Sequence, residues 1–174
     1  MDSNPRFLVR YPFSITDRKK EKPMSVKFSG PRTVFDPVLD ENYTSGQSLF
    51  NPVEISLLTP EKRASRLTQV SLIWDVANAP PVTIFVFNAE PTNFGNAKAT
   101  PALTFVERAS IIGVLDFATT DYDQLNGLDI GTIVGPLAEL SSADQRGWLT
   151  ARINAAYTGD LEDKLKIAMQ IERM

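Results

Sequence analysis

Apolar and polar residues alternate along most of the chain after residue 53, and this period of two predicts β-strands. The clearest run covers residues 165–172. There Leu165, Ile167, Met169 and Ile171 alternate with mostly polar neighbours. A strand of this kind has one face on the core and the other in water, which is typical of an antiparallel sheet.

A second kind of strand is expected at residues 82–87, which read VTIFVF. Nearly all of these side chains are β-branched or aromatic, so we expect both faces of this strand to be buried. Further strands are expected at residues 53–58, 69–74, 111–117, 130–134 and 148–153. Clusters of turn-forming residues separate the strands at residues 78–81, 92–96, 126–127 and 158–160.

Helix signals are few. A short helix is expected with Thr100 as its N-cap and Pro101 as its first residue, continuing towards Glu107, and a second helical turn is expected at residues 142–146. Short strands separated by turns predict an all-β fold. We therefore expect an antiparallel, jelly-roll-like β-sandwich with one or two short helices and an extended N-terminal arm.

The N-terminal arm is expected to cover residues 1–41, and the β-sandwich domain residues 42–174. Five prolines in the first region leave no room for a useful helix, yet the region is too apolar for a simple solvated linker. An extended arm that lies along the surface of a partner explains both observations. The alternative is an edge strand packed on the chain's own sandwich.

The apolar side chains of the arm suggest how it would bind. In an extended chain Phe7, Val9, Tyr11 and Phe13 point to one side. Residues 1–23 contain six basic and three acidic residues, which gives a net charge of +3. The remainder of the chain contains twelve basic and eighteen acidic residues, which gives a net charge of −6. The residues expected to contact a partner are Arg6, Phe7, Val9, Arg10, Tyr11 and Phe13.

Composition limits the possible chemistry, because the chain has no cysteine and no histidine. This removes Cys and Ser-His nucleophile systems, thiolate and imidazole zinc sites, and disulfides. Phosphate-binding, dinucleotide-binding and nucleophile-elbow glycine motifs are absent as well. We expect no enzyme activity, no catalytic, cofactor-binding or metal-binding residues, no cofactor and no small-molecule substrate.

Partners and location follow from similar arguments. The acidic remainder would repel nucleic acid, and the longest apolar stretches are too short to span a membrane, so neither is expected as a partner. The N-terminus lacks the apolar core of a secretory signal, and we expect the protein to stay in the cytosol where it is made.

Two acidic groups are the remaining candidates for chemistry. Residues 121–129 hold three carboxylates, but Leu125 and Asn126 occupy positions where a calcium loop needs a ligand and a glycine. A solvated turn is therefore favoured over an irregular calcium site. A carbohydrate-binding jelly roll or a carboxylate hydrolase would use Glu90, Asp116, Asp121 or Asp123. Trp74 and Trp148 are interpreted as core residues.

Several segments together resemble small virion structural proteins of tailed phages, of the capsid decoration or cement type. The resemblance covers roughly residues 43–174 and keeps the order of the segments. It begins at YTSGQ and continues through LTQVSLIWD and the most specific segment, TIFVFNAEPTNF. The strand IIGVLDF and the C-terminal strand complete it. Residues 1–42 have no counterpart in the family pattern.

The resemblance implies a non-enzymatic structural role with no catalytic residues to carry over. Capsid decoration or cement is the expected role, with the protein on the capsid surface of a virion that is assembled in the host cytoplasm. The expected partners are the major capsid protein and neighbouring copies of the chain, as a homotrimer or dimer. The alternative within the virion is a tail, connector or baseplate protein.

Overall fold

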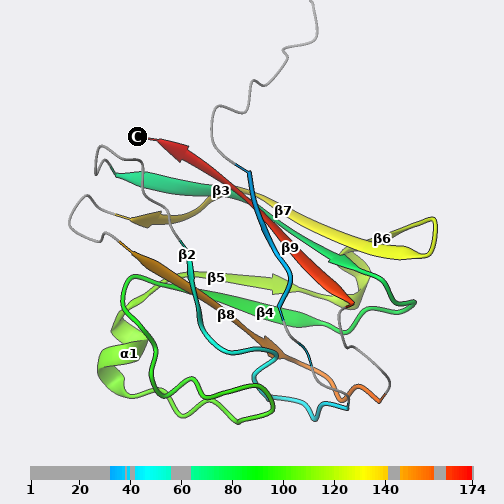
Figure 1. Ribbon diagram of the computed structural model, residues 1–174, viewed down its shortest axis with the longest axis horizontal. Coiled ribbons are helices and arrows are strands. Elements are labelled where there is room, and N and C mark those ends of the chain that lie inside the picture. The colour runs from blue at the N-terminus through cyan, green and yellow to red at the C-terminus, as the bar shows by residue number, and fades with distance from the viewer. Residues whose placement is uncertain are drawn as a thin grey trace, which may run out of the picture.

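The computed structural model describes residues 32–37, 39, 42–55, 64–140, 146–158 and 164–173. These residues form two antiparallel sheets that face each other, with one short helix beside the smaller sheet (Figure 1). The larger sheet has the strand order β1-β9-β3-β7-β6 and the smaller sheet the order β2-β8-β4-β5. The elements are β1 (Arg32–Phe35), β2 (Val53–Ile55), β3 (Ser65–Trp74), β4 (Val82–Phe87), α1 (Phe105–Ala109), β5 (Ile111–Phe117), a 3-10 turn (Thr119–Asp121), β6 (Tyr122–Leu125), β7 (Leu128–Leu140), β8 (Gly147–Ile153) and β9 (Leu165–Arg173).

The strand pairing has a nested order. β4 pairs with β5, β3 with β7, β2 with β8 and β1 with β9, each in antiparallel fashion. The chain therefore runs like one long hairpin that has been rolled up, and the rolling brings β9 beside β3 and β8 beside β4. Eight strands with this pairing make a jelly roll, to which β6 adds an edge strand. The expected fold class is confirmed.

The core lies between the two sheets, where the inward side chains of both meet. Leu72 and Trp74 of β3 and Ile167 of β9 come from the larger sheet, and Ile84 of β4 and Leu149 of β8 come from the smaller one. All five are fully buried. The period of two in the sequence thus corresponds to the burial of alternate side chains, and burial of each large apolar side chain contributes roughly 1.5–3 kcal/mol.

The two tryptophans differ in position. Trp74 lies in the core, as expected. Trp148 lies on β8 next to the inward-facing Leu149, so its side chain is on the outer face of the smaller sheet and is only partly buried. Its cross-strand neighbours there are Glu54 of β2 and Phe87 of β4.

The segment expected to be a solvated turn, residues 121–129, contains a strand instead. β6 and β7 form a hairpin whose two-residue turn is Asn126-Gly127. Both turn residues have positive φ, at 52° and 84°, which is the conformation of a type I′ turn. The sequence pattern did not predict β6 because an exposed edge strand needs few apolar side chains, and most of β6 is exposed.

Three further expectations concern the two helices and the N-terminal arm. The helix α1 begins later than expected, because Thr104 and not Thr100 is its N-cap. Strand β1 lies within residues 1–41, the segment assigned to the arm, and it pairs with β9 as an edge strand of the chain's own sandwich. The second helical turn, expected at residues 142–146, lies almost wholly outside the described residues.

Candidate interaction surfaces

The arm residues expected to contact a partner all lie outside the described residues. They are Arg6, Phe7, Val9, Arg10, Tyr11 and Phe13. Their role therefore stays a prediction. Within the described part of the chain, no helix is long and apolar enough to cross a membrane.

Two of the acidic residues considered for catalysis, Asp116 and Asp121, accept local hydrogen bonds. The carboxylate of Asp116 on β5 accepts a hydrogen bond of 2.6 Å from the Thr83 hydroxyl on β4. That of Asp121 accepts one of 2.7 Å from the backbone N–H of Ala118. Glu90 lies in the loop after β4, in a small recess that no other carboxylate lines.

The acidic cluster of residues 121–129 is split by the β6–β7 hairpin. Asp129 is buried and its carboxylate accepts a hydrogen bond of 2.7 Å from the backbone N–H of Ala79. Nearby, Tyr122 donates from its hydroxyl to the Pro80 carbonyl, and burial raises the pKa of Tyr122 above its ordinary value. Among the described residues, no group of three or more acidic side chains is arranged to hold a metal ion.

The first surface of interest is the mouth of the sandwich, where both sheets have an edge strand. β1 ends the larger sheet and β2 ends the smaller one. A recess of about 410 Å³ lies between them, lined by Phe35 of β1 and Val53 of β2. Within the described part of the chain, the outer edges of these two strands have no strand partner.

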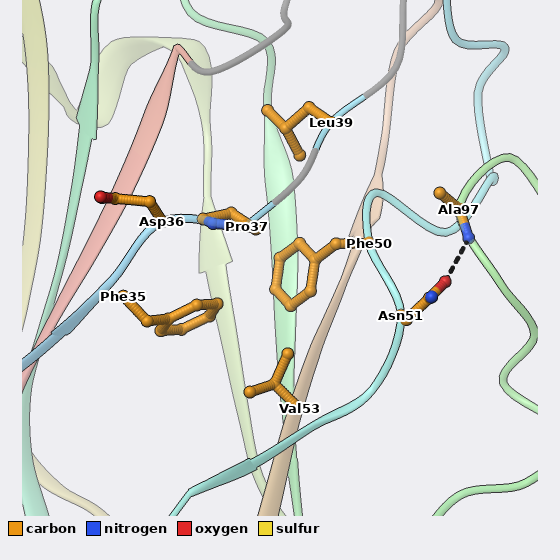
Figure 2. Close-up of a pocket in the computed structure, with 8 residues that line it drawn as sticks. All are labelled: Phe35, Asp36, Pro37, Leu39, Phe50, Asn51, Val53 and Ala97. Carbon is orange, nitrogen blue, oxygen red and sulfur yellow. Dashed lines mark hydrogen bonds between the residues drawn. The ribbon is translucent and has the colours of Figure 1, made fainter.

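Figure 2 shows how the mouth is built. The rings of Phe35 and Phe50 meet edge to face with their centroids 5.7 Å apart, and Leu39 lies beyond Phe50. Asn51 fixes the far wall, because its side-chain oxygen accepts a hydrogen bond of 2.9 Å from the backbone N–H of Ala97. Edge-to-face aromatic contacts of this kind add about 0.5–1.5 kcal/mol beyond area burial. The mouth is thus an apolar recess with a fixed shape.

The second surface lies on the outer face of the smaller sheet, beneath the long connection from β4 to β5 (Figure 1). Phe85 and Phe87 of β4 point outward there, and Phe94 from the connection packs on both rings, at centroid distances of 5.5 and 6.1 Å. Phe87 and Phe94 are fully buried as a result. The expectation that residues 82–87 are buried on both faces is confirmed.

One carboxylate fixes the helix that follows. Glu107 of α1 accepts hydrogen bonds from the backbone N–H groups of Asn93 and Thr104, at 2.7 and 2.9 Å, and from the side chains of Thr92, Asn93 and Thr104. These hydrogen bonds, first those from the two backbone groups, lower the pKa of Glu107 to about 2. The Thr104 hydroxyl in turn accepts a hydrogen bond from the backbone N–H of Glu107. Thr104 is therefore the N-cap of α1, and the two residues form a capping box.

The helix held in this way presents apolar side chains to solvent. Phe105 is 87% exposed and Val106 is 76% exposed, more than any other large apolar side chain among the described residues. Beside them lies a recess of about 290 Å³ that is lined by Phe85, Phe94, Pro101, Leu103, Arg108, Ile111 and Arg152. We call Phe105, Val106 and this recess the α1 surface.

Two guanidinium groups border the recess of the α1 surface. That of Arg152 lies over the ring of Phe85, 5.7 Å from its centroid, within the range of a cation–π contact. Arg108 is the other. Arginine and aromatic residues are enriched in protein–protein interfaces, and exposed apolar patches often mark such interfaces. The α1 surface therefore has the character of a contact surface.

The sequence contained a signal for the start of α1 that the N-cap assignment at Thr100 missed. Thr104 and Glu107 have the spacing of a capping box, with Phe105 and Val106 between them. Placing the cap at Thr100 instead puts Val106 inside a longer helix.

Comparison with known proteins adds little beyond the fold. No protein-family model and no curated protein sequence matches the chain. The chain is similar to a chain of the solved structure "The limits of structural plasticity in a picornavirus capsid revealed by a massively expanded equine rhinitis A virus particle". The match has a TM-score of 0.34 and 16% sequence identity, and covers 100% of this chain and 87% of that one. A likeness at this TM-score does not bear on function, and the fold class rests on the strand pairing.

Proposed function

We propose that this chain is a non-enzymatic structural protein of a virion, namely a capsid decoration or cement protein. In this role it binds the major capsid protein and neighbouring copies of itself on the capsid surface, and so stabilises the shell. The observation that carries the proposal is the exposure of Phe105 on a helix that Glu107 holds in place. Phe105, Val106 and the recess beside them form an exposed apolar patch, and such patches mark contact sites.

The other features of the chain support the same role. Two of the carboxylates considered as catalysts, Asp116 and Asp121, accept local hydrogen bonds. The segments of residues 43–174 that resemble phage decoration proteins favour a virion rather than another assembly. In this proposal the basic N-terminal arm supplies a further contact to the capsid, through Phe7, Tyr11 and Phe13.

The proposal is tested on purified particles of the virus that encodes the chain. Mass spectrometry should detect the chain in the particles, with a band intensity comparable to that of the major capsid protein. Particles assembled without the chain should lose their contents at a lower temperature, and adding purified protein should restore the original temperature. If washed particles contain no detectable chain, the proposed function is wrong.

An enzyme assay provides an independent test. A broad hydrolase screen with the purified protein should show no turnover. Turnover that disappears in Asp121→Asn or Asp123→Asn would contradict the non-enzymatic role. These two residues are chosen because they are the exposed carboxylates within residues 121–129.

A second candidate function is favoured by the nested strand pairing. Jelly rolls of eight strands form the shells of many viruses, and the described strands have this topology. The chain would then be the shell subunit itself. Expression of the chain alone distinguishes the two, because a shell subunit forms closed particles visible by electron microscopy. A decoration protein stays a small soluble species and binds only to preformed shells.

A further inference from the structure

A protruding aromatic side chain and an apolar recess lie side by side on the α1 surface. Phe105 projects from the first turn of α1 and is 87% exposed. Arg108, three residues later and so on the same side of the helix, lines the recess together with Leu103. Phe105 itself does not line this recess.

The recess has the chemistry to receive an aromatic ring. Its floor includes Phe85 and Phe94, whose rings are inclined at 59° to each other, and a third ring could continue this tilted packing. Arg108 and Arg152 line it, and the guanidinium group of Arg152 lies over the ring of Phe85. Such groups attract the face of an aromatic ring. No carboxylate lines the recess, so a basic guest side chain has no ion-pair partner there.

Phe105 cannot supply that ring to the recess of its own chain without moving α1. The capping box of Thr104 and Glu107 fixes the start of the helix, and the bonds from Asn93 to Glu107 tie it to the preceding loop. The ring therefore does not occupy the recess of its own chain. In a pair of copies related by a two-fold axis, a contact between the ring of one copy and the recess of the other occurs twice, which makes the contact self-complementary.

We infer that two copies of the chain pair through their α1 surfaces, with Phe105 of each copy seated in the recess of the other, beside Leu103 and Arg108. This inference rests on the proposal that the α1 surface is an assembly contact, and it names a second copy as the partner there. Val106, exposed on the adjacent position of the helix, lies at the margin of the contact.

Sedimentation equilibrium of the full chain tests the pairing. The wild-type chain should be a concentration-dependent dimer. Phe105→Ser should weaken it by at least about 10-fold in dissociation constant for each ring lost, a factor that follows from the free energy of burying one aromatic side chain. Because Phe105 is exposed in the single chain, this variant should melt at the wild-type temperature when both are measured at a concentration at which the wild type is monomeric. Leu125→Ser, an exposed apolar residue on the β6–β7 hairpin, is the matched control and should leave the dimer unchanged.

A mixing experiment tests whether the ring enters the recess of the other copy. Leu103→Glu places a charge in the recess but keeps Phe105, whereas Phe105→Ser keeps the recess. Each variant alone should be monomeric. An equimolar mixture should contain a heterodimer detectable by native mass spectrometry, because one of the two ring-in-recess contacts is restored. Failure of this mixture to pair, with both variants folded, contradicts the inference.

The remaining outcomes separate this inference from the proposed function. A wild-type chain that stays monomeric, or a Phe105→Ser variant that dimerises like the wild type, overturns the two-fold pairing. If that chain is nevertheless found in purified particles in stoichiometric amount, the proposed function stands without the pairing. A dimer that depends on Phe105 but is absent from particles supports the pairing and overturns the virion role.

Discussion

The backbone N–H of Asn93 donates a hydrogen bond of 2.7 Å to a carboxylate oxygen of Glu107, and this bond ties α1 to the loop that precedes it. The connection from β4 to β5 is the longest one within residues 64–140. Long connections without internal ties tend to be variable in structure. Here one side chain links both ends of the connection, and the exposed Phe105 is held in place as a consequence.

The pH dependence of this tie follows from the low pKa of Glu107. The pKa is lowered from 4.5 to about 2 in the folded state, so the unfolded chain binds more protons between these values. The stabilisation is therefore fully present above pH 4.5 and is lost as the pH falls towards 2. The melting temperature of Glu107→Gln should be lower than that of the wild type at pH 7, and the difference should shrink as the pH falls through this window.

Thermal melts at several pH values measure this difference. Glu139→Gln is the control, since Glu139 is an exposed carboxylate in a surface pair with Arg66 and should matter little at any pH. A Glu107→Gln deficit that is the same at pH 3 and pH 7 would show that the charge of the carboxylate is not what holds the connection.

The approach of β5 to β7 leaves no room for a side chain at Gly113. A Cβ atom there would lie 2.8 Å from the carbonyl oxygen of Leu137 and 3.0 Å from the Cβ of Ala138. Because the nearest atom belongs to the backbone of β7, a side chain at position 113 would have to displace that strand. Gly113→Ala should therefore lower the free energy of unfolding by about 1–3 kcal/mol. Val114→Ala, at the next and half-exposed position, should change it by about 0.5 kcal/mol or less. Urea denaturation of both variants checks the comparison.

The sandwich could be predicted from sequence because its strands bury alternate side chains. The runs at residues 82–87 and 165–172 correspond to β4 and β9, where the inward positions are fully buried or nearly so. Strands that bury little are different. β6 is an exposed edge strand held mainly by backbone pairing to β7. Its sequence lacks the alternation of apolar residues that would have predicted a strand.

The α1 surface could not be predicted in the same way. Its character depends on Phe105 being exposed, and hydrophobicity alone suggests the opposite for a phenylalanine. It also depends on Phe85, Phe94 and Arg152 meeting from three separate segments, which only the strand register brings together. The capping box at Thr104 was visible locally but says nothing about which side chains face the solvent.

The carbonyl of Phe50 accepts two buried hydrogen bonds near the mouth of the sandwich. One comes from the Ser48 hydroxyl at 2.9 Å and the other from the Thr150 hydroxyl at 3.1 Å. Removing either one leaves the carbonyl with a partner, so Ser48→Ala and Thr150→Val should each cost only about 0.5–1.5 kcal/mol. The double variant leaves a buried carbonyl unpaired and should cost about 1–3 kcal/mol more than the sum. A double-mutant cycle from urea denaturation measures this excess, and strict additivity would contradict the shared-acceptor explanation.

In the proposed function the N-terminal arm binds the capsid through residues that lie outside the described part of the chain. Burying an aromatic side chain contributes roughly 1.5–3 kcal/mol, whereas an exposed charge pair contributes about 0–1 kcal/mol. The aromatic residues should therefore dominate attachment to particles, and the basic ones should mainly guide encounter. Tyr11→Ala combined with Phe13→Ala should release the protein from particles in a co-sedimentation assay at physiological salt. The matched control replaces Arg18, Lys19 and Lys20 by alanine and should change the bound fraction little. If high salt alone strips the wild-type protein while the aromatic double variant stays bound, attachment is electrostatic and the ranking of the two effects is reversed.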